Sequence, residues 1–330
     1  MISQGRHLVK FPDQNHISNY TTQETSMHIT KAIVPVAGLG TRLLPTTKAL
    51  PKEMLPVGRL PVIHHVVEEL VSAGIRQILF VTSGNKSVIA EHFDENSELT
   101  RRLGTDQQDL LEACRFDYRT RGIEFFTVRQ RCLPGHTTPA GTGDAVAAGQ
   151  AFVANQDFVV AFGDSIVHSS TSETLLQRMI FSHLNHHSTC TIGAYQVPDA
   201  LVHRYGILIP EDAGSADCKL TDIIEKPSPD QTSSRLAISA RYIFSPSVFE
   251  RIHALTPTPN GEIYLTDAIA TLISEGTMVR AVRLGETDKR YDIGNHLAYF
   301  ETFIDYAFDD PEWGAQIQSY VRGKMDREPT

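Results

Sequence analysis

The sequence predicts an α/β fold in which helices flank a mixed, mostly parallel sheet. Strand-like and helix-like stretches alternate along most of the chain, which is typical of parallel strands joined by helices. Two strand-like stretches, QILFVT at 77–82 and DFVVAF at 157–162, are continuous apolar runs, as expected of strands buried on both faces. Consecutive strand-like stretches at 190–225 indicate an added antiparallel part.

The N-terminal half supplies the first alternating units. The run at 31–37 precedes a glycine turn, and the helical pattern at 61–73 is closed by Gly74. A helix at 173–184 has Ser172 placed to cap it. The other strands expected in this half are 77–82, 123–128 and 157–162. The other helices expected are 86–93, 98–114 and 142–153.

The C-terminal half is richer in strands. Strands are expected at 190–197, 206–209, 219–225, 237–244 and 279–284. Helices are expected at 246–254, 263–274 and 296–308. We therefore expect three parts: a polar N-terminal extension at 1–29, one domain at 30–310, and a C-terminal tail at 311–330. The tail holds the sole tryptophan and is expected to pack on the body or on a neighbouring subunit.

The composition favours a cytoplasmic enzyme. The 330 residues carry a net charge of −9, which argues against nucleic acid or an anionic membrane as the main partner. No apolar run approaches the roughly 18 residues that a membrane span needs, and the polar N-terminus predicts no secretory signal. The four cysteines include no C-x-x-C pair, so we expect reduced thiols rather than a zinc or dithiol site.

The most informative motif is the turn Gly38-Leu39-Gly40-Thr41-Arg42, which follows the first strand directly. A tight glycine turn exposes backbone N–H groups that bind phosphate oxygens. Arg42 and Lys52 supply two cations that would neutralise a polyphosphate. A dinucleotide fingerprint would need glycine instead of Leu43, and no P-loop triplet is present. The motif therefore indicates a different kind of nucleotide chemistry.

The residues after the turn identify a family. Thr-Arg-Leu follows the glycine pair, and Pro-Lys-Glu-Met-Leu-Pro follows at 51–56. Together they resemble the signature of the sugar-1-phosphate nucleotidylyltransferases, and in detail that of the bacterial UTP–glucose-1-phosphate uridylyltransferases. The resemblance runs from about residue 31 to about residue 309. It implies a Rossmann-like sheet and a transfer of the uridylyl group from UTP to glucose 1-phosphate, with pyrophosphate released.

Such a reaction joins two anions, so it depends on positioning and charge neutralisation and needs no nucleophilic side chain. The resemblance gives catalytic roles to Arg42, Lys52, Asp164 and Lys226. It also makes Asp164, after the strand at 157–162, and Asp292 the ligands of Mg²⁺, which takes one or two carboxylates plus substrate phosphates. Taken alone, Asp164 could equally be a helix cap or turn residue, and Asp292 would read as a turn residue.

The resemblance also assigns the sugar contacts. Glu225 is expected to accept hydrogen bonds from sugar hydroxyls, and Lys226 to meet the sugar phosphate. Gly206 permits a close approach of the backbone to the sugar. Without the resemblance, the Glu225–Lys226 pair would read as a solvated surface feature and Gly206 as part of a turn.

The base contacts come from elsewhere in the chain. Ala37, Gly38, Glu53 and Gln130 fall on positions that resemble the family's uracil contacts. Backbone groups with a carboxylate and an amide can complement an imide N–H between two carbonyls. Gly141 matches a glycine that closes over the nucleotide, and Gly40 of the glycine turn is also expected to bind the nucleotide.

Two departures from the family pattern lie near this pocket. The stretch between Gln130 and Gly141 is longer than usual, and Asp144 stands where a histidine is usual. Two alternatives therefore remain beside the uridylyltransferase: a relative that uses dTTP or another sugar 1-phosphate, and a weakly active regulatory paralogue that binds nucleotide sugar. The presence of all five charged catalytic and metal positions favours catalysis. The resemblance also implies a homo-oligomer.

Overall fold

The computed structural model describes residues 28–84, 86–94, 98, 101–102, 118–132, 138–169, 171 and 173–326. Residues 1–27 of the extension expected at 1–29, and most of the helix expected at 98–114, lie outside these residues.

A nine-stranded sheet forms the centre of the described chain. Its strands are β1 (Lys31–Pro35), β4 (Gln77–Thr82), β5 (Glu124–Arg129), β6 (Phe158–Ala161), β8 (Cys190–Gln196), β9 (Gly206–Pro210), β10 (Asp217–Glu225), β11 (Leu236–Phe244) and β12 (Val279–Arg283). Their spatial order is β5-β4-β1-β6-β11-β8-β12-β10-β9. The pairings show that β10 and β11 run opposite to the other strands. The predicted mixed, mostly parallel sheet is therefore confirmed.

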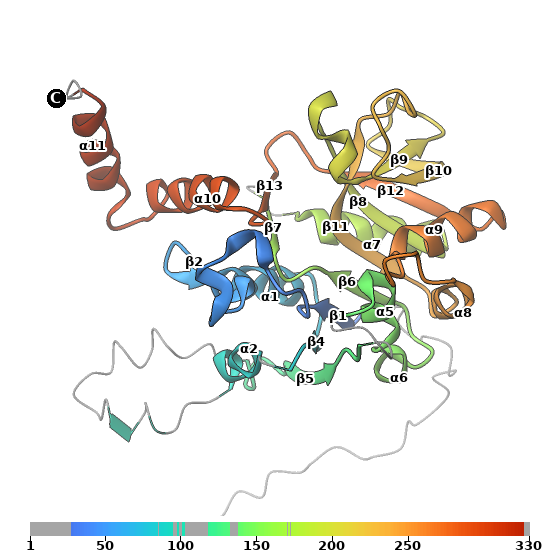
Figure 1. Ribbon diagram of the computed structural model, residues 1–330, viewed down its shortest axis with the longest axis horizontal. Coiled ribbons are helices and arrows are strands. Elements are labelled where there is room, and N and C mark those ends of the chain that lie inside the picture. The colour runs from blue at the N-terminus through green and yellow to red at the C-terminus, as the bar shows by residue number, and fades with distance from the viewer. Residues whose placement is uncertain are drawn as a thin grey trace, which may run out of the picture.

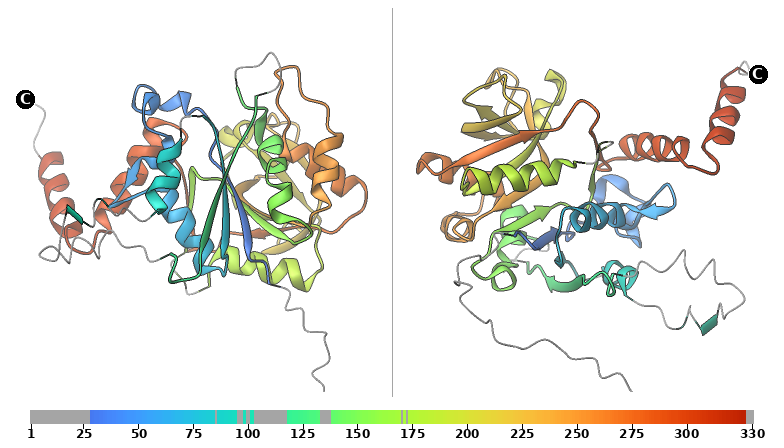
Figure 2. Two further views of the ribbon diagram at one scale, coloured as in Figure 1. Left: turned by 90° about the horizontal axis from the view of Figure 1, so that it is seen from below. Right: turned by 180° about the vertical axis from the view of Figure 1, so that it is seen from behind.

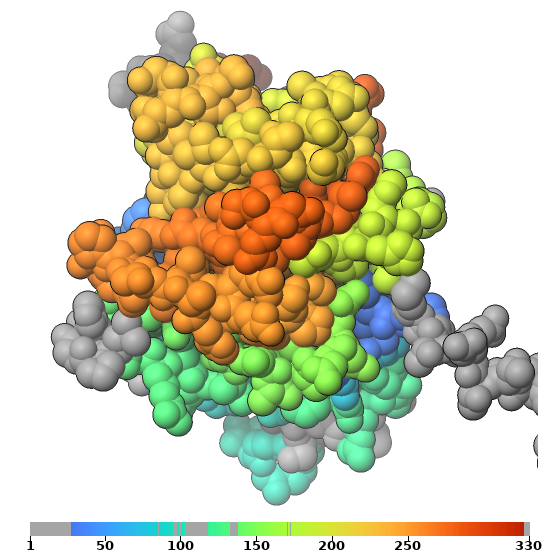
Figure 3. Space-filling model, turned by 90° about the vertical axis from the view of Figure 1, so that its right-hand side faces the viewer, coloured from blue at the N-terminus to red at the C-terminus, as the bar shows by residue number. Residues whose placement is uncertain are grey.

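Helices cover both faces of this sheet, as Figures 1 and 2 show. One face packs against α1 (Val62–Ser72), α2 (Ser87–Phe93) and α7 (Leu175–Asn185). The other packs against α5 (Gly141–Ala147), α6 (Gln150–Val153), α8 (Val248–Ala254) and α9 (Leu265–Ser274). In the space-filling view, the orange segment of α8 and α9 lies across the middle, below the yellow segment of β9 and β10 (Figure 3). Two apolar layers therefore hold the sheet between them.

Two short antiparallel pairs lie outside the main sheet. One joins β2 (Pro56–Val57) to β3 (Leu60–Pro61), and the other joins β7 (Ser165–His168) to β13 (Lys289–Asp292). The sequence did not predict β7 or β13, which are only four residues long. The second pair matters for function because it joins two segments that are far apart in the sequence.

Two expected helices differ in detail. The helix expected at 142–153 is two helices, α5 and α6, interrupted at Gly149. A Cβ atom on Gly149 would lie 2.4 Å from Cδ1 of Ile33, so the chain packs too closely on β1 there for any larger residue. The helix expected at 173–184 begins at Leu175. Its cap is Thr174, whose hydroxyl accepts a hydrogen bond from the Gln177 N–H at 3.3 Å, while the expected cap Ser172 lies outside the described residues.

The C-terminal segment forms an arm that projects from the body (Figure 1; Figure 2, right). It consists of α10 (His296–Phe308), as predicted, and α11 (Gly314–Met325). The arm is tied to the body by Arg59, whose guanidinium binds Asp310 at 2.7 and 2.9 Å. No helix in the described part of the chain is long and apolar enough to cross a membrane.

A buried ion pair joins three elements beneath the strand ends. Arg241 on β11 has no exposed surface, and its guanidinium donates to both carboxylate oxygens of Glu69 on α1, the closest pair of atoms being 2.6 Å apart. It also donates to the carbonyl oxygens of Ser165, at 2.8 Å, and Ala240, at 3.1 Å. Ala240 has a φ of +64°, and the register of β11 shifts around it. Arg241 thus adds a side-chain hydrogen bond to the Ala240 carbonyl, which also accepts from the Phe162 N–H at 3.2 Å, and it joins β11 to the start of β7 through the Ser165 carbonyl.

We predict that Arg241→Met will lower the free energy of unfolding by about 3–5 kcal/mol, because Glu69 is left charged and unpaired in the core. The double variant Glu69→Leu/Arg241→Met should recover part of this loss. Urea unfolding would measure both effects. Arg59→Met, which removes an exposed ion pair, is the matched control and should change stability little. Similar losses in the Arg241 and Arg59 variants would contradict this prediction.

Candidate active site

The glycine turn joins β1 to a short 3₁₀ helix at Thr41–Leu43. Gly40 has a φ of +66°, and the Thr47 hydroxyl donates to its carbonyl oxygen at 2.7 Å. Within the described residues, the N–H groups of residues 37–40 donate no hydrogen bond. The turn therefore presents unused donors at the carboxyl end of β1, as phosphate binding requires.

Lys52 lies beside this turn and pairs with Asp164. Burial alone would lower the pKa of Lys52, but the carboxylates of Asp164 and Glu53 raise it above its usual value. Burial would raise the pKa of Asp164, but Lys52 lowers it below its usual value. Both side chains are therefore charged at neutral pH, and each stabilises the charge of the other.

The two predicted metal ligands are brought together by the β7–β13 pair. Asp164 immediately precedes Ser165, which lies opposite Asp292 in the register, and the Ile293 N–H donates to the Asp164 carbonyl at 3.4 Å. The Asp292 carboxylate accepts from Arg290 at 3.2 Å and from the Gly294 N–H at 3.0 Å. The two carboxylates thus lie at neighbouring positions, although 127 residues separate them in the chain.

These carboxylates fit a divalent cation that is completed by substrate. No group of three or more histidine, cysteine, aspartate or glutamate residues in the described ranges could hold a metal by itself. Two aspartates match the small protein share of a Mg²⁺ shell, in which phosphates and waters fill the other positions. The Lys52 ammonium already binds Asp164, which shows that a cation is favourable at this position.

A second cation lies on the other side of Asp292. A Cβ atom on Gly294 would lie 3.0 Å from the Asp292 carboxylate and 3.1 Å from the Arg42 guanidinium, so these groups converge over this glycine. Arg290 supports Asp292 from below. Its side chain is 8% exposed, and its guanidinium lies 4.8 Å from the centre of the Tyr195 ring. Burial would lower the pKa of Arg290, but Asp292 raises it above its usual value.

One cavity of about 900 Å³ joins the two halves of the predicted site. The phosphate and metal half contributes three of the predicted residues, and the sugar half contributes three more. In chain order, they are Arg42, Asp164, Gly206, Glu225, Lys226 and Asp292. The cavity therefore brings the predicted phosphate and metal residues together with the predicted sugar-binding residues.

The sugar half depends on the absence of a side chain at Gly206. Gly206 lies opposite Glu225 in the β9–β10 pair, and a Cβ atom there would come within 2.6 Å of Ile238 and 3.2 Å of the Glu225 carboxylate. Lys226 follows with a φ of +46°. Its ammonium lies 3.1 Å from Glu225 and 4.8 Å from the centre of the Tyr264 ring. The backbone bend thus turns Lys226 toward the cavity wall formed by Tyr264.

The predicted base contacts form two hydrogen-bonded sets near the ends of the neighbouring strands β1, β4 and β5. Glu53 is buried and accepts from the Lys86 ammonium at 2.8 and 3.1 Å, while Lys86 also donates to the Gly38 carbonyl at 2.7 Å. The Gln130 amide donates to the Gly141 carbonyl at 3.0 Å. Ala37 adjoins Gly38 in the turn. The structure thus brings these residues together, while their contacts with a base stay a prediction.

Two residues of the site were not predicted. Lys86 follows β4 in a polar stretch with no motif, so nothing in the sequence marks it. Arg290 lies two positions before Asp292 on β13, and this spacing places both side chains on one face of a strand. Recognition of β13 as a strand would have drawn attention to Arg290.

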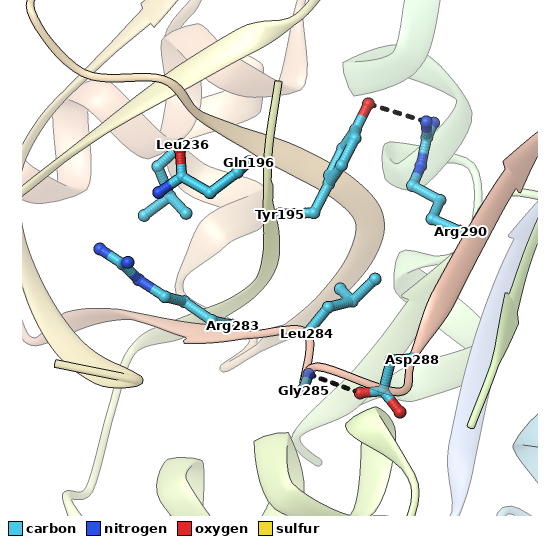
Figure 4. Close-up of a pocket in the computed structure, with 8 residues that line it drawn as sticks. All are labelled: Tyr195, Gln196, Leu236, Arg283, Leu284, Gly285, Asp288 and Arg290. Atoms are coloured by element: carbon cyan, nitrogen blue, oxygen red, sulfur yellow. Dashed lines mark hydrogen bonds between the residues drawn. The ribbon is translucent and has the colours of Figure 1, made fainter. Parts of the chain in front are cut away.

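A smaller pocket of about 400 Å³ adjoins the main cavity and shares Tyr195, Gln196 and Arg290 with it. In Figure 4 the Arg290 guanidinium donates to the Tyr195 hydroxyl at 2.9 Å, and Asp288 accepts from the Gly285 N–H at 2.8 Å. The Tyr195 hydroxyl in this pocket thus holds the Arg290 guanidinium in place.

Comparison with known proteins gives a consistent result. Residues 31–308 match the model of a family described as nucleotidyl transferase. UTP–glucose-1-phosphate uridylyltransferases from Staphylococcus epidermidis and Bacillus subtilis are each 36% identical to the chain, over 295 and 301 residues. These alignments cover 89% and 91% of this chain and 98% of each relative.

A solved structure agrees with these relatives. The UTP-bound UGPase from Acinetobacter baumannii superposes with a TM-score of 0.78 at 32% identity, covering 89% of this chain and 99% of that one. Fold, motif positions and sequence similarity extend over the same residues. The chain belongs to the nucleotidyl transferase family.

Proposed function

We propose that this protein is a UTP–glucose-1-phosphate uridylyltransferase, which forms UDP-glucose and pyrophosphate. The observation that carries the proposal is the single cavity that joins Arg42, Asp164 and Asp292 to Glu225 and Lys226. A nucleotidyl transfer to a sugar phosphate needs both sets of groups around one reacting phosphorus. The relatives that carry this name share most of the chain's length.

In the proposed reaction, a phosphate oxygen of glucose 1-phosphate attacks the α-phosphorus of UTP. The bond from that phosphorus to the bridging oxygen breaks, and pyrophosphate leaves with the bonding electrons. The unused N–H groups at 37–40, with Arg42 and Lys52, stabilise the triphosphate and its leaving group. Lys226 holds the attacking phosphate, and Glu225 orients the sugar through its hydroxyls. Gly206 gives the sugar room.

The proposed metal is Mg²⁺, held by Asp164 and Asp292. When bound, it supplies positive charge to the phosphates. Lys52 then has a second role, because the carboxylate it now neutralises becomes a metal ligand and frees its ammonium for phosphate. For the base, we propose that Ala37, Gly38, Glu53, Gln130 and Gly141 surround the uracil.

The direct test of the activity is release of pyrophosphate from UTP and glucose 1-phosphate. We expect release with Mg²⁺, none with excess EDTA, and recovery when Mg²⁺ is restored. Asp292→Asn should lower kcat by about a hundredfold, because an electrostatic contact to the reacting phosphates is lost. Asp94→Asn, at an exposed helix end, is the matched control and should leave kcat unchanged.

Other outcomes of this assay identify the alternatives. Equal kcat/KM with dTTP would favour a thymidylyl-transferring relative. Binding of UTP or UDP-glucose without pyrophosphate release would favour the regulatory paralogue. A normal kcat in Asp292→Asn would contradict the assignment of Asp292 as a metal ligand.

Lys226→Ala should raise the KM for glucose 1-phosphate by about tenfold, because a charged hydrogen bond to the sugar-side phosphate is lost. The Kd for UTP, measured by titration calorimetry, should not change. Lys219→Ala, an exposed lysine on β10, is the control. A weaker UTP affinity with an unchanged KM for glucose 1-phosphate would show that Lys226 does not hold the sugar phosphate.

We also propose that the protein is cytoplasmic and that it consists of a domain at 30–310 and a tail at 311–330. We further propose that it forms a homo-oligomer through its C-terminal arm, which includes this tail. Supporting this, α10, α11 and the turn between them expose several large apolar residues: Leu297, Phe300, Ile304, Trp313 and Tyr320. Monomeric proteins rarely leave such a patch uncovered. The α11 helix itself is fixed to α10, since the Gln318 amide donates to the Phe308 carbonyl at 3.2 Å.

Phe300→Asp should therefore shift the protein from oligomer to monomer, as measured by light scattering. Phe181→Asp, which changes an even more exposed phenylalanine on α7, is the matched control and should leave the mass unchanged. A wild-type protein that is already monomeric, or an unchanged mass in Phe300→Asp, would contradict this interface.

A further inference from the structure

The amide of Gln130 is held in one orientation. Gln130 follows β5, and its N–H donates to the carbonyl of Thr82 at the end of β4. Its side-chain Nε2 donates to the Gly141 carbonyl at 3.0 Å and to the Asp144 carboxylate at 2.8 Å. A backbone carbonyl and a carboxylate can only accept, so the group that faces them must be the NH₂ end of the amide.

This arrangement leaves Oε1 as the remaining polar atom of the side chain. Gln130 is 8% exposed. Its Oε1 has no hydrogen-bond partner among the described residues, and it is not one of their fully enclosed unpaired atoms. It therefore keeps access to solvent. Both hydrogens of the amide are already used, so Gln130 can offer a ligand an acceptor but not a donor.

We infer that Asp144 is a positioning residue that fixes the Gln130 amide so that Oε1 accepts a hydrogen bond from the imide N–H of the base. This inference rests on the proposed function. Uracil carries a hydrogen on N3, whereas N3 of cytosine is an acceptor and would face Oε1 with lone pair against lone pair. The Asp144–Gln130 pair thus selects UTP over CTP. Thymine has the same imide, so the pair does not distinguish UTP from dTTP.

Asp144 has a second possible role that a test must separate. It lies in the first turn of α5, where a negative charge is favourable. Asp144→Ala removes both the charge and the acceptor oxygen. Asp144→Asn removes the charge but keeps an amide oxygen that can rotate toward Gln130. Only the positioning role predicts different results for the two variants.

The experiment is titration calorimetry of the full-length protein with UTP and with CTP, without sugar phosphate. We expect the wild-type protein to bind UTP more tightly. The ratio of the Kd for CTP to the Kd for UTP should fall about fivefold or more in Asp144→Ala and stay near the wild-type value in Asp144→Asn. Gln130→Met should lower the ratio at least as much, and it provides the test if Asp144→Ala does not fold.

An unchanged ratio in Asp144→Ala, an equal fall in both Asp144 variants, or a wild-type protein without preference for UTP would each overturn the inference. These results are distinguishable from failure of the proposed function. Binding is measured without turnover, and the pyrophosphate assay tests turnover without reference to Asp144. General damage to the pocket would weaken UTP and CTP binding together and leave the ratio unchanged.

Discussion

The buried pair of Glu69 and Arg241 is the interaction on which the site depends. Moving both charges out of water costs free energy. The hydrogen bond from the guanidinium to the Ser165 carbonyl, together with the bonds between the two side chains, offsets part of this cost. Ser165 is the first residue of β7. The Arg241 side chain, which joins α1 to β11, therefore also fixes the position of β7 relative to β11. The neighbouring Asp164 and the opposite Asp292 are therefore positioned by a contact that no substrate touches.

Charges of opposite sign alternate across the ends of the strands. Lys86 binds Glu53, Lys52 binds Asp164, and Arg290 binds Asp292. Each carboxylate is thus neutralised by a basic side chain before any ligand binds. This pairing reduces the electrostatic repulsion among the three carboxylates. A triphosphate with its metal brings both signs of charge, so it can exchange partners with this network without leaving a buried charge unpaired.

The sequence predicted the sheet, the reaction class and a cluster of site residues, and the relatives confirm the family and the fold. Prediction worked where the signal is local: an apolar run for β4 and a helical pattern closed by Gly74 for α1. It failed where tertiary contacts decide. The close packing of Gly149 on Ile33 involves residues far apart in the sequence, and β7 and β13 are strands because they pair with each other. Lys86 was missed because only the fold brings it to Glu53.

The β7–β13 ribbon also has a consequence for the newly made chain. During translation, Asp164 emerges early, but Asp292 follows only after β8 to β12 have been made. N-terminal units generally fold first as a chain is synthesised. The glycine turn can therefore form while the carboxylate pair is still incomplete. In the nascent chain, the pair of aspartates is therefore completed only when residues near 292 have been made, so catalytic competence arises late in synthesis.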